Sequence, residues 1–134
     1  MTNQEPMSFG ADPFEQAFGT QVGPVHLPSL LDANRERALA ELGPWVDQLI
    51  TRFSIDPRVI PPCWRKHNGI VESLFALRDH EGASYAPSAS PAAAVDWLRA
   101  LHDVTSFLTQ LSAMTMCSVG EHREPFRHQP SGEG

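Results

Sequence analysis

Two cysteine–histidine pairs are the residues whose types and spacing suggest chemistry. The segment PPCWRKH at residues 61–67 and the segment CSVGEH at residues 117–122 contain the only two cysteines of the chain, each followed by a histidine. Two thiolates with two neutral imidazoles form a common donor set for a structural zinc ion in closed tetrahedral coordination. We name this set the Cys/His cluster, and its members are Cys63, His67, Cys117 and His122.

The same residues allow two other interpretations. Cys63 and Cys117 can form a disulfide or a redox pair, or they can be two unrelated buried thiols. The N-terminal residues show no basic region followed by an apolar one, so a secretory signal is not expected. A reducing, cytoplasmic setting favours metal binding over a structural disulfide. The sequence therefore predicts Zn²⁺ in a structural role.

The elements that must position the cluster are predicted from hydrophobic periodicity. A first helix is expected from about Ser29, because Ser29 and Asp32 have the spacing of a capping box. The pair Gly43–Pro44 is expected to break or kink this helix. Residues 54–62 contain three prolines and are predicted to form a linker.

Two further helices are expected to form an antiparallel hairpin. One is predicted from Pro62 or Cys63 to about Gly82, and the other from Ser90, as its N-cap, to Met116. The connection between them is short, so the start of one helix should lie beside the end of the other. The first Cys–His pair has the i, i+4 spacing of a single helix face, and the second pair follows the last helix. The Cys/His cluster is therefore expected at one end of the hairpin.

The predicted fold is all-α, a small three-helix up-down bundle whose hairpin is fastened by zinc. We assign residues 1–28 and residues 124–134 to disordered tails, and residues 29–123 to the helical domain. No apolar run approaches the roughly 18 residues of a membrane span, so membrane insertion is not expected.

The N-terminal tail contains three phenylalanines, Phe9, Phe14 and Phe18. Phe14 and Phe18 are four residues apart, so a short helical turn would place both on one face. This spacing is typical of a segment that orders when it docks on a protein partner. The alternative is a tail with scattered aromatic residues.

Charge and motif content disfavour several functions. The formal net charge of −6 argues against a surface that neutralises nucleic-acid phosphates, although Arg65, Lys66 and Arg123 lie near the cluster in sequence. A catalytic zinc needs an open position, with Glu121 as the available base. The motifs of zinc metalloproteases and deaminases, however, do not occur in the sequence.

The remaining candidates are assigned structural roles. The three tryptophans are expected to be core or core-rim anchors, and His102 is expected on a helix flank. Three acids are interpreted as solvated surface charges, namely Asp79, Glu81 and Asp103.

The order of these motifs resembles a group of small uncharacterised actinobacterial proteins associated with plasmids, integrated elements and phages. The resemblance covers residues 45–123 and rests on WVDQLITRF, PPCWRKHNGIVESLFAL, SPAAAVDWLRALHDVTSFLTQL and CSVGEH. It implies a soluble accessory protein, with the four residues of the Cys/His cluster matching the group's Cys/His pattern. It implies no activity.

Taken together, these patterns predict a non-enzymatic, zinc-stabilised cytoplasmic protein that acts as an interaction or adaptor module. The expected partner is a protein, contacted by the N-terminal phenylalanines or by a helix face. The first alternative is a nucleic-acid-associated regulator of a mobile element or phage. The second alternative is a zinc-dependent hydrolase.

Overall fold

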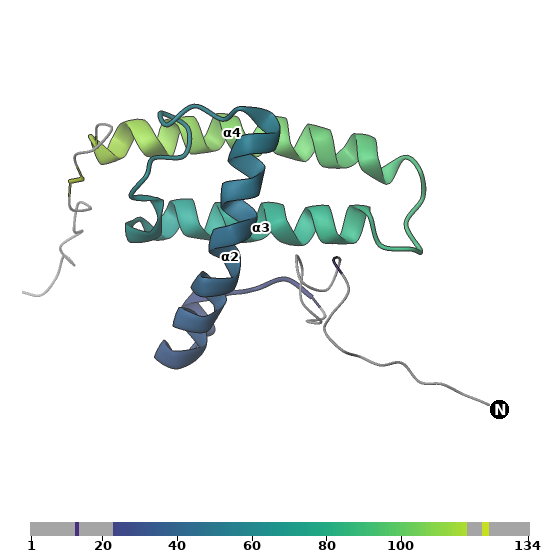
Figure 1. The fold of residues 1–134 in the computed structure, drawn as a ribbon, viewed down its shortest axis with the longest axis horizontal. Coiled ribbons are helices and arrows are strands. Elements are labelled where there is room, and N and C mark those ends of the chain that lie inside the picture. The colour runs from purple at the N-terminus through teal and green to yellow at the C-terminus, as the bar shows by residue number, and fades with distance from the viewer. Residues whose placement is uncertain (1–12, 14–22, 118–121, 124–134) are drawn as a thin grey trace, which may run out of the picture.

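The computed structural model describes residues 23–117 together with Pro13, His122 and Arg123. Within these residues the chain is helical and forms no strand, which confirms the all-α prediction. Figure 1 shows α3 and α4 side by side as an antiparallel hairpin, with α2 lying across it. The elements, in order, are η1 (Leu27–Ser29), α2 (Asp32–Phe53), η2 (Trp64–Lys66), α3 (Asn68–Ser84) and α4 (Ala93–Thr115).

The core lies where α2 meets the hairpin. Its side chains recur at spacings of three and four along each helix, which is the pattern of an amphipathic helix packing one face inward. Trp45, Trp64 and Trp97 are at most 4% exposed, which confirms their prediction as anchors. The other buried apolar side chains of the three helices are Leu42, Val46, Leu49, Ile70, Val71, Leu74, Phe75, Leu77, Leu101 and Leu108.

The packed part of the chain begins before α2. Leu27, in the single turn η1, is 3% exposed and belongs to the core, and Val25 packs against that core. The Val25 N–H also donates a hydrogen bond of 2.9 Å to the carboxylate of Asp79 in α3. The packed part of the chain therefore includes apolar residues before the predicted domain boundary at residue 29.

The predicted capping box at the start of α2 is wrong. The hydroxyl of Ser29 donates to the carbonyl of His26, at 2.9 Å, and so closes η1 instead of capping α2. Leu30 and Leu31 are extended, and the helix begins at Asp32. The carboxylate of Asp32, in the first turn of α2, still interacts favourably with the positive end of the helix dipole.

Helix α2 continues through Pro44 without a break. Figure 1 shows a bend along α2, and a proline inside a helix produces one because it lacks the N–H that would bond to the preceding turn. Gly43, next to it, is buried, and a Cβ at this position would lie 2.1 Å from a guanidinium nitrogen of Arg65. The glycine therefore leaves room for Arg65 to reach the surface of α2.

Helix α3 begins later than predicted, and neither member of the first Cys–His pair is inside it. Cys63 is the N-cap of the short turn η2, and His67 is the N-cap of α3, with extended dihedral angles of φ −124° and ψ 105°. Two prolines precede this turn, and Trp64 within it is buried in the core. Burying Trp64 through a tight turn ends η2 at Lys66 and delays the start of α3.

The end of the hairpin opposite the Cys/His cluster is held by a buried carboxylate. Glu81, near the end of α3, is only 5% exposed, so its prediction as a solvated charge is wrong. It accepts a hydrogen bond of 3.0 Å from the indole N–H of Trp45 and two bonds, at 2.5 and 3.3 Å, from the guanidinium of Arg52. Both partners belong to α2, so Glu81 joins α2 to the hairpin.

The segment between α2 and η2 is tied to α4 by one buried hydroxyl. Ser112, which is 6% exposed, donates a hydrogen bond of 2.8 Å to the carbonyl of Val59. Replacing Ser112 by alanine should leave that carbonyl without this donor and cost about 1 kcal/mol of unfolding free energy. Chemical denaturation of Ser112→Ala measures the loss. The control is Ser106→Ala, since Ser106 is exposed and bonds only within its own helix; equal losses in both variants would contradict the prediction.

Candidate metal centre

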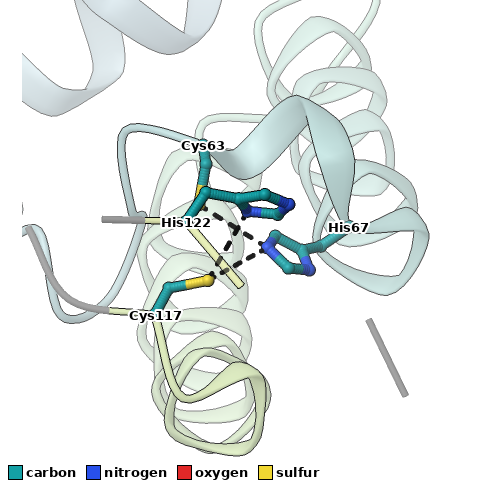
Figure 2. Close-up of side chains that lie close together, drawn as sticks. All are labelled: Cys63, His67, Cys117 and His122. Atoms are coloured by element: carbon teal, nitrogen blue, oxygen red, sulfur yellow. Dashed lines mark hydrogen bonds between the residues drawn. The ribbon is translucent and has the colours of Figure 1, made fainter. Parts of the chain in front are cut away.

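The hairpin brings the two Cys–His pairs to one end of the molecule. Cys63 and His67 flank the turn η2 just before α3, and Cys117 follows α4 directly. Helix α4 ends at Thr115, and its C-cap Met116 has a left-handed φ of 61°, which turns the chain. In Figure 2 the side chains of the Cys/His cluster point toward a common centre from both sides.

The distances within the cluster match those of a tetrahedral zinc site. The Nε2 atom of His67 lies 3.5 Å from the sulfur of Cys63 and 3.5 Å from the sulfur of Cys117. The Nδ1 atom of His122 lies 3.6 Å from the sulfur of Cys117. With zinc–sulfur bonds of about 2.3 Å and zinc–nitrogen bonds of about 2.05 Å, tetrahedral angles place sulfur and nitrogen about 3.5–3.6 Å apart.

The remaining ligand pairs are also close. All four ligand atoms lie within 4.8 Å of one another. A tetrahedral site with two thiolates requires a sulfur–sulfur separation of about 3.8 Å, so a shift on the order of 1 Å in the widest pair completes the geometry. Both cysteines are free thiols and are partly buried, and His67 is 5% exposed. The donor set and its spacing therefore fit a metal ion.

A backbone group of Arg123 contacts the sulfur of Cys117. The backbone N–H of Arg123 donates a hydrogen bond of 3.1 Å to this sulfur. The backbone N–H of Cys117 itself donates to the hydroxyl of Thr115, also at 3.1 Å. Hydrogen bonds from backbone N–H groups to a ligand atom orient it and stabilise its charged form.

The two thiols differ in acidity. Burial raises the pKa of the Cys63 thiol, and the neighbouring sulfur of Cys117 adds to this rise. Burial also acts to raise the pKa of Cys117, but contacts with Thr115 and the backbone of Arg123 outweigh it, so the pKa of that thiol is lowered. Cys117 is therefore the readier thiolate ligand of the pair.

The prediction that the four residues meet at one end of the hairpin is confirmed. The reason given for the first pair is wrong, because Cys63 and His67 approach each other across the turn η2 and do not share a helix face. The interpretation of two unrelated thiols is also wrong, since both sulfurs belong to one cluster. Glu121, the candidate base, lies outside the described residues.

Other predicted candidates lie away from this centre. His102 and Asp103 are on the exposed side of α4, as predicted. Asp79 is partly buried and accepts the Val25 N–H, so its prediction as a solvated charge is wrong. Burial raises the pKa of the Asp79 carboxyl, although the hydrogen bond from Val25 opposes the rise. The predicted partner-binding residues Phe9, Phe14 and Phe18 lie outside the described residues.

A groove that the sequence did not reveal lies next to Cys117. It has a volume of about 500 Å³ and lies between the segment after α2 and the end of α4. Pro57 and Pro61 of the predicted linker form part of its wall. Their presence in the sequence predicted an extended segment but not a groove. The lining residues include Pro57, Pro61, Thr109, Ser112, Ala113 and Cys117. One cysteine of the Cys/His cluster, Cys117, thus lines a surface groove.

Comparison with family models, with curated proteins and with solved structures gave no match. The resemblance to actinobacterial mobile-element proteins therefore stays a prediction. Among the described residues, no helix combines the length and apolar character needed to cross a bilayer.

Proposed function

We propose that the chain binds one structural Zn²⁺ through the Cys/His cluster, and that the zinc-fastened helical domain acts as a protein-interaction or adaptor module in the cytoplasm. The observation that carries the zinc assignment is the set of three sulfur–nitrogen distances of 3.5–3.6 Å. They equal the tetrahedral ligand separations of zinc, and they involve residues from opposite ends of the hairpin sequence.

The ligand composition favours zinc in a structural role. Thiolates and imidazoles are soft or borderline donors and suit Zn²⁺ better than magnesium or calcium, which prefer oxygen. Four protein ligands fill a tetrahedral shell, so the water needed by a zinc hydrolase has no coordination position. A structural ion at this place would hold the end of α4 against the start of α3.

An interaction role is supported by exposed apolar side chains along α4. Four large apolar side chains on this helix are each at least half exposed, and apolar side chains at that exposure are suited to contact with a partner. They are Val95, Leu98, Phe107 and Met114. The phenylalanines of the N-terminal segment, Phe9, Phe14 and Phe18, provide a second set of apolar anchors in an acidic background.

The nucleic-acid alternative has weaker support. The chain carries a net charge of −6, and Arg78 is buried. The guanidinium of Arg65 lies over the ring of Trp64, 4.6 Å from its centroid. This contact with the ring competes with contact to a nucleic-acid phosphate. Salt-sensitive binding of DNA by the purified chain would favour this alternative over the protein-interaction role.

The zinc assignment is tested by metal analysis. The chain purified without chelator should contain one zinc per molecule, and replacing zinc by Co²⁺ should give the visible spectrum of a tetrahedral site with two thiolates. His67→Ala should lower the zinc content sharply, since it removes the ligand nearest to both sulfurs. His102→Ala, which changes an exposed histidine outside the cluster, is the matched control. Absence of zinc from the unmodified chain would refute the proposal.

The interaction role is tested at the N-terminal phenylalanines. Replacing both Phe14 and Phe18 by alanine should abolish capture of a protein partner from native lysate, because docking segments depend on a few apolar anchors. Zinc content and helicity should not change. Phe126→Ala is the matched control in the other terminal segment. Equal capture of the partner by the unmodified chain, the double variant and the Phe126→Ala control would contradict a role for the two phenylalanines.

A further inference from the structure

We infer that the Cys/His cluster is redox-sensitive, and that a hydroperoxide converts Cys63 and Cys117 to a disulfide with release of the metal and of His122. This inference rests on the zinc binding proposed above and concerns the regulation of the same site. It follows from the placement of the two sulfurs, the access to one of them and the way in which His122 is held.

The two sulfurs are placed to form a bond with each other. Both belong to the cluster and lie within 4.8 Å of one another, whereas a disulfide requires about 2.05 Å. Neither cysteine is inside an α-helix: Cys63 precedes the short turn η2, and Cys117 follows the left-handed Met116. Small backbone changes on both sides can therefore close the distance without unwinding α3 or α4.

Only one of the two cysteines lines the groove. Cys117 faces the groove of about 500 Å³, which is large enough to admit a small hydroperoxide. Cys63 is not among the residues that line it. This asymmetry assigns the two roles that a peroxide-driven disulfide needs, with Cys117 attacked first and Cys63 as the resolving thiol.

The reaction balances with hydrogen peroxide as the oxidant. The Cys117 thiolate attacks one peroxide oxygen, the O–O bond breaks, and the products are a sulfenic acid and hydroxide. The Cys63 thiolate then attacks the sulfur of Cys117, forming the S–S bond and expelling a second hydroxide. Two electrons pass from the two thiolates to one peroxide. The disulfide retains neither thiolate, and two imidazoles alone hold zinc weakly, so the metal leaves.

Oxidation would not open the hairpin. The disulfide would link residues 63 and 117, the same two points that the metal links, so α3 and α4 stay fastened. His122, in contrast, would be tied to the cluster as a metal ligand, in addition to its contacts with Cys117 and with the ring of His67. The backbone N–H of Arg123 would also lose its thiolate acceptor. The change proposed on oxidation is therefore loss of metal coordination by His122 and loss of the thiolate acceptor of the Arg123 N–H, which loosens these two residues.

The experiment uses the full chain with its zinc. Zinc content is measured first, and hydrogen peroxide is then added while a chromogenic chelator records zinc release and mass spectrometry records the thiols. One zinc released per intramolecular disulfide, with both changes reversed by a reductant and added zinc, is the expected result. Trypsin should cleave after Arg123 faster in the oxidised form than in the zinc form.

Cys63→His is the variant that separates the steps. It keeps four potential metal ligands but removes the resolving thiol, so peroxide should produce no disulfide and no reversible zinc release. Zinc that is retained by the unmodified chain, or lost only with irreversible oxidation or with disulfides between chains, would overturn the redox inference and leave the zinc site intact. Absence of zinc before peroxide is added would instead refute the proposed function.

Discussion

Removal of the metal is expected to lower the stability of the chain more than any single change on its surface. Zinc that binds the folded state and not the unfolded state adds about 4 kcal/mol to the free energy of unfolding when the concentration of free zinc exceeds the dissociation constant a thousandfold. For a domain of this size, that corresponds to about 15 °C or more in melting temperature. The hairpin ends at the cluster would separate first, because the proposed zinc would join the start of α3 to the end of α4. Thermal melting with and without chelator measures the shift.

The same loss is expected when a ligand is replaced. Cys117→Ser removes a sulfur that contacts both histidines of the cluster, so its melting temperature should approach that of the chelated protein and should no longer respond to chelator. Ser106→Ala, on the exposed side of α4, should respond to chelator as the unmodified chain does. An unchanged melting curve after chelation of the unmodified chain would show that the metal has no structural role.

Loss of the buried carboxylate is expected to give the second large effect. Glu81→Ala leaves the buried indole N–H of Trp45 without its acceptor and Arg52 without its ion-pair partner. Because Arg52 is 36% exposed, it can turn to water, so the expected loss is about 2–3 kcal/mol and not the full cost of a buried unpaired charge. Chemical denaturation measures this loss.

Two controls isolate the ion pair. Glu72→Ala changes an exposed acid on the same helix and should alter stability by at most about 0.5 kcal/mol. The second control is a double-mutant cycle. Arg52→Met should lower the free energy of unfolding less in the Glu81→Ala background than in the unmodified chain, because the carboxylate that pairs with Arg52 is already absent. Additive losses would show that Arg52 and Glu81 do not interact.

The sequence predicted those features that depend on periodicity and topology. Apolar residues at helical spacing identified the three helices, since only one face of each is buried. The short connection before α4 implied an antiparallel hairpin, and that topology alone placed Cys63 and Cys117 at the same end. These steps needed no knowledge of how the helices pack against one another.

Local detail at helix ends was not predictable in this way. The sequence favoured a helix that includes Cys63 and His67, but burial of Trp64 imposes a separate turn there. Ser29 has the residue type and spacing of an N-cap, yet its hydroxyl bonds to His26. In each case a contact within the three-dimensional structure outweighs a local preference, and the sequence window does not contain that contact.

Buried charges were missed for a related reason. Glu81 looks like a surface acid because its sequence neighbours are polar, and only the docking of α2 brings Trp45 and Arg52 to it. A charged side chain is buried when its partners arrive from another element. Such partners are separated from it by many residues, so no short pattern reveals them.

The placement of the proposed zinc ligands implies an order of events during synthesis of the chain. Domains form as the chain emerges from its N-terminal end, and the ligands at residues 63 and 67 appear long before those at residues 117 and 122. The first pair alone offers one thiolate and one imidazole, which hold zinc weakly. Tight coordination of the proposed zinc must therefore wait until α4 has been made and has docked on α3, so its uptake would mark completion of the hairpin and could not initiate it.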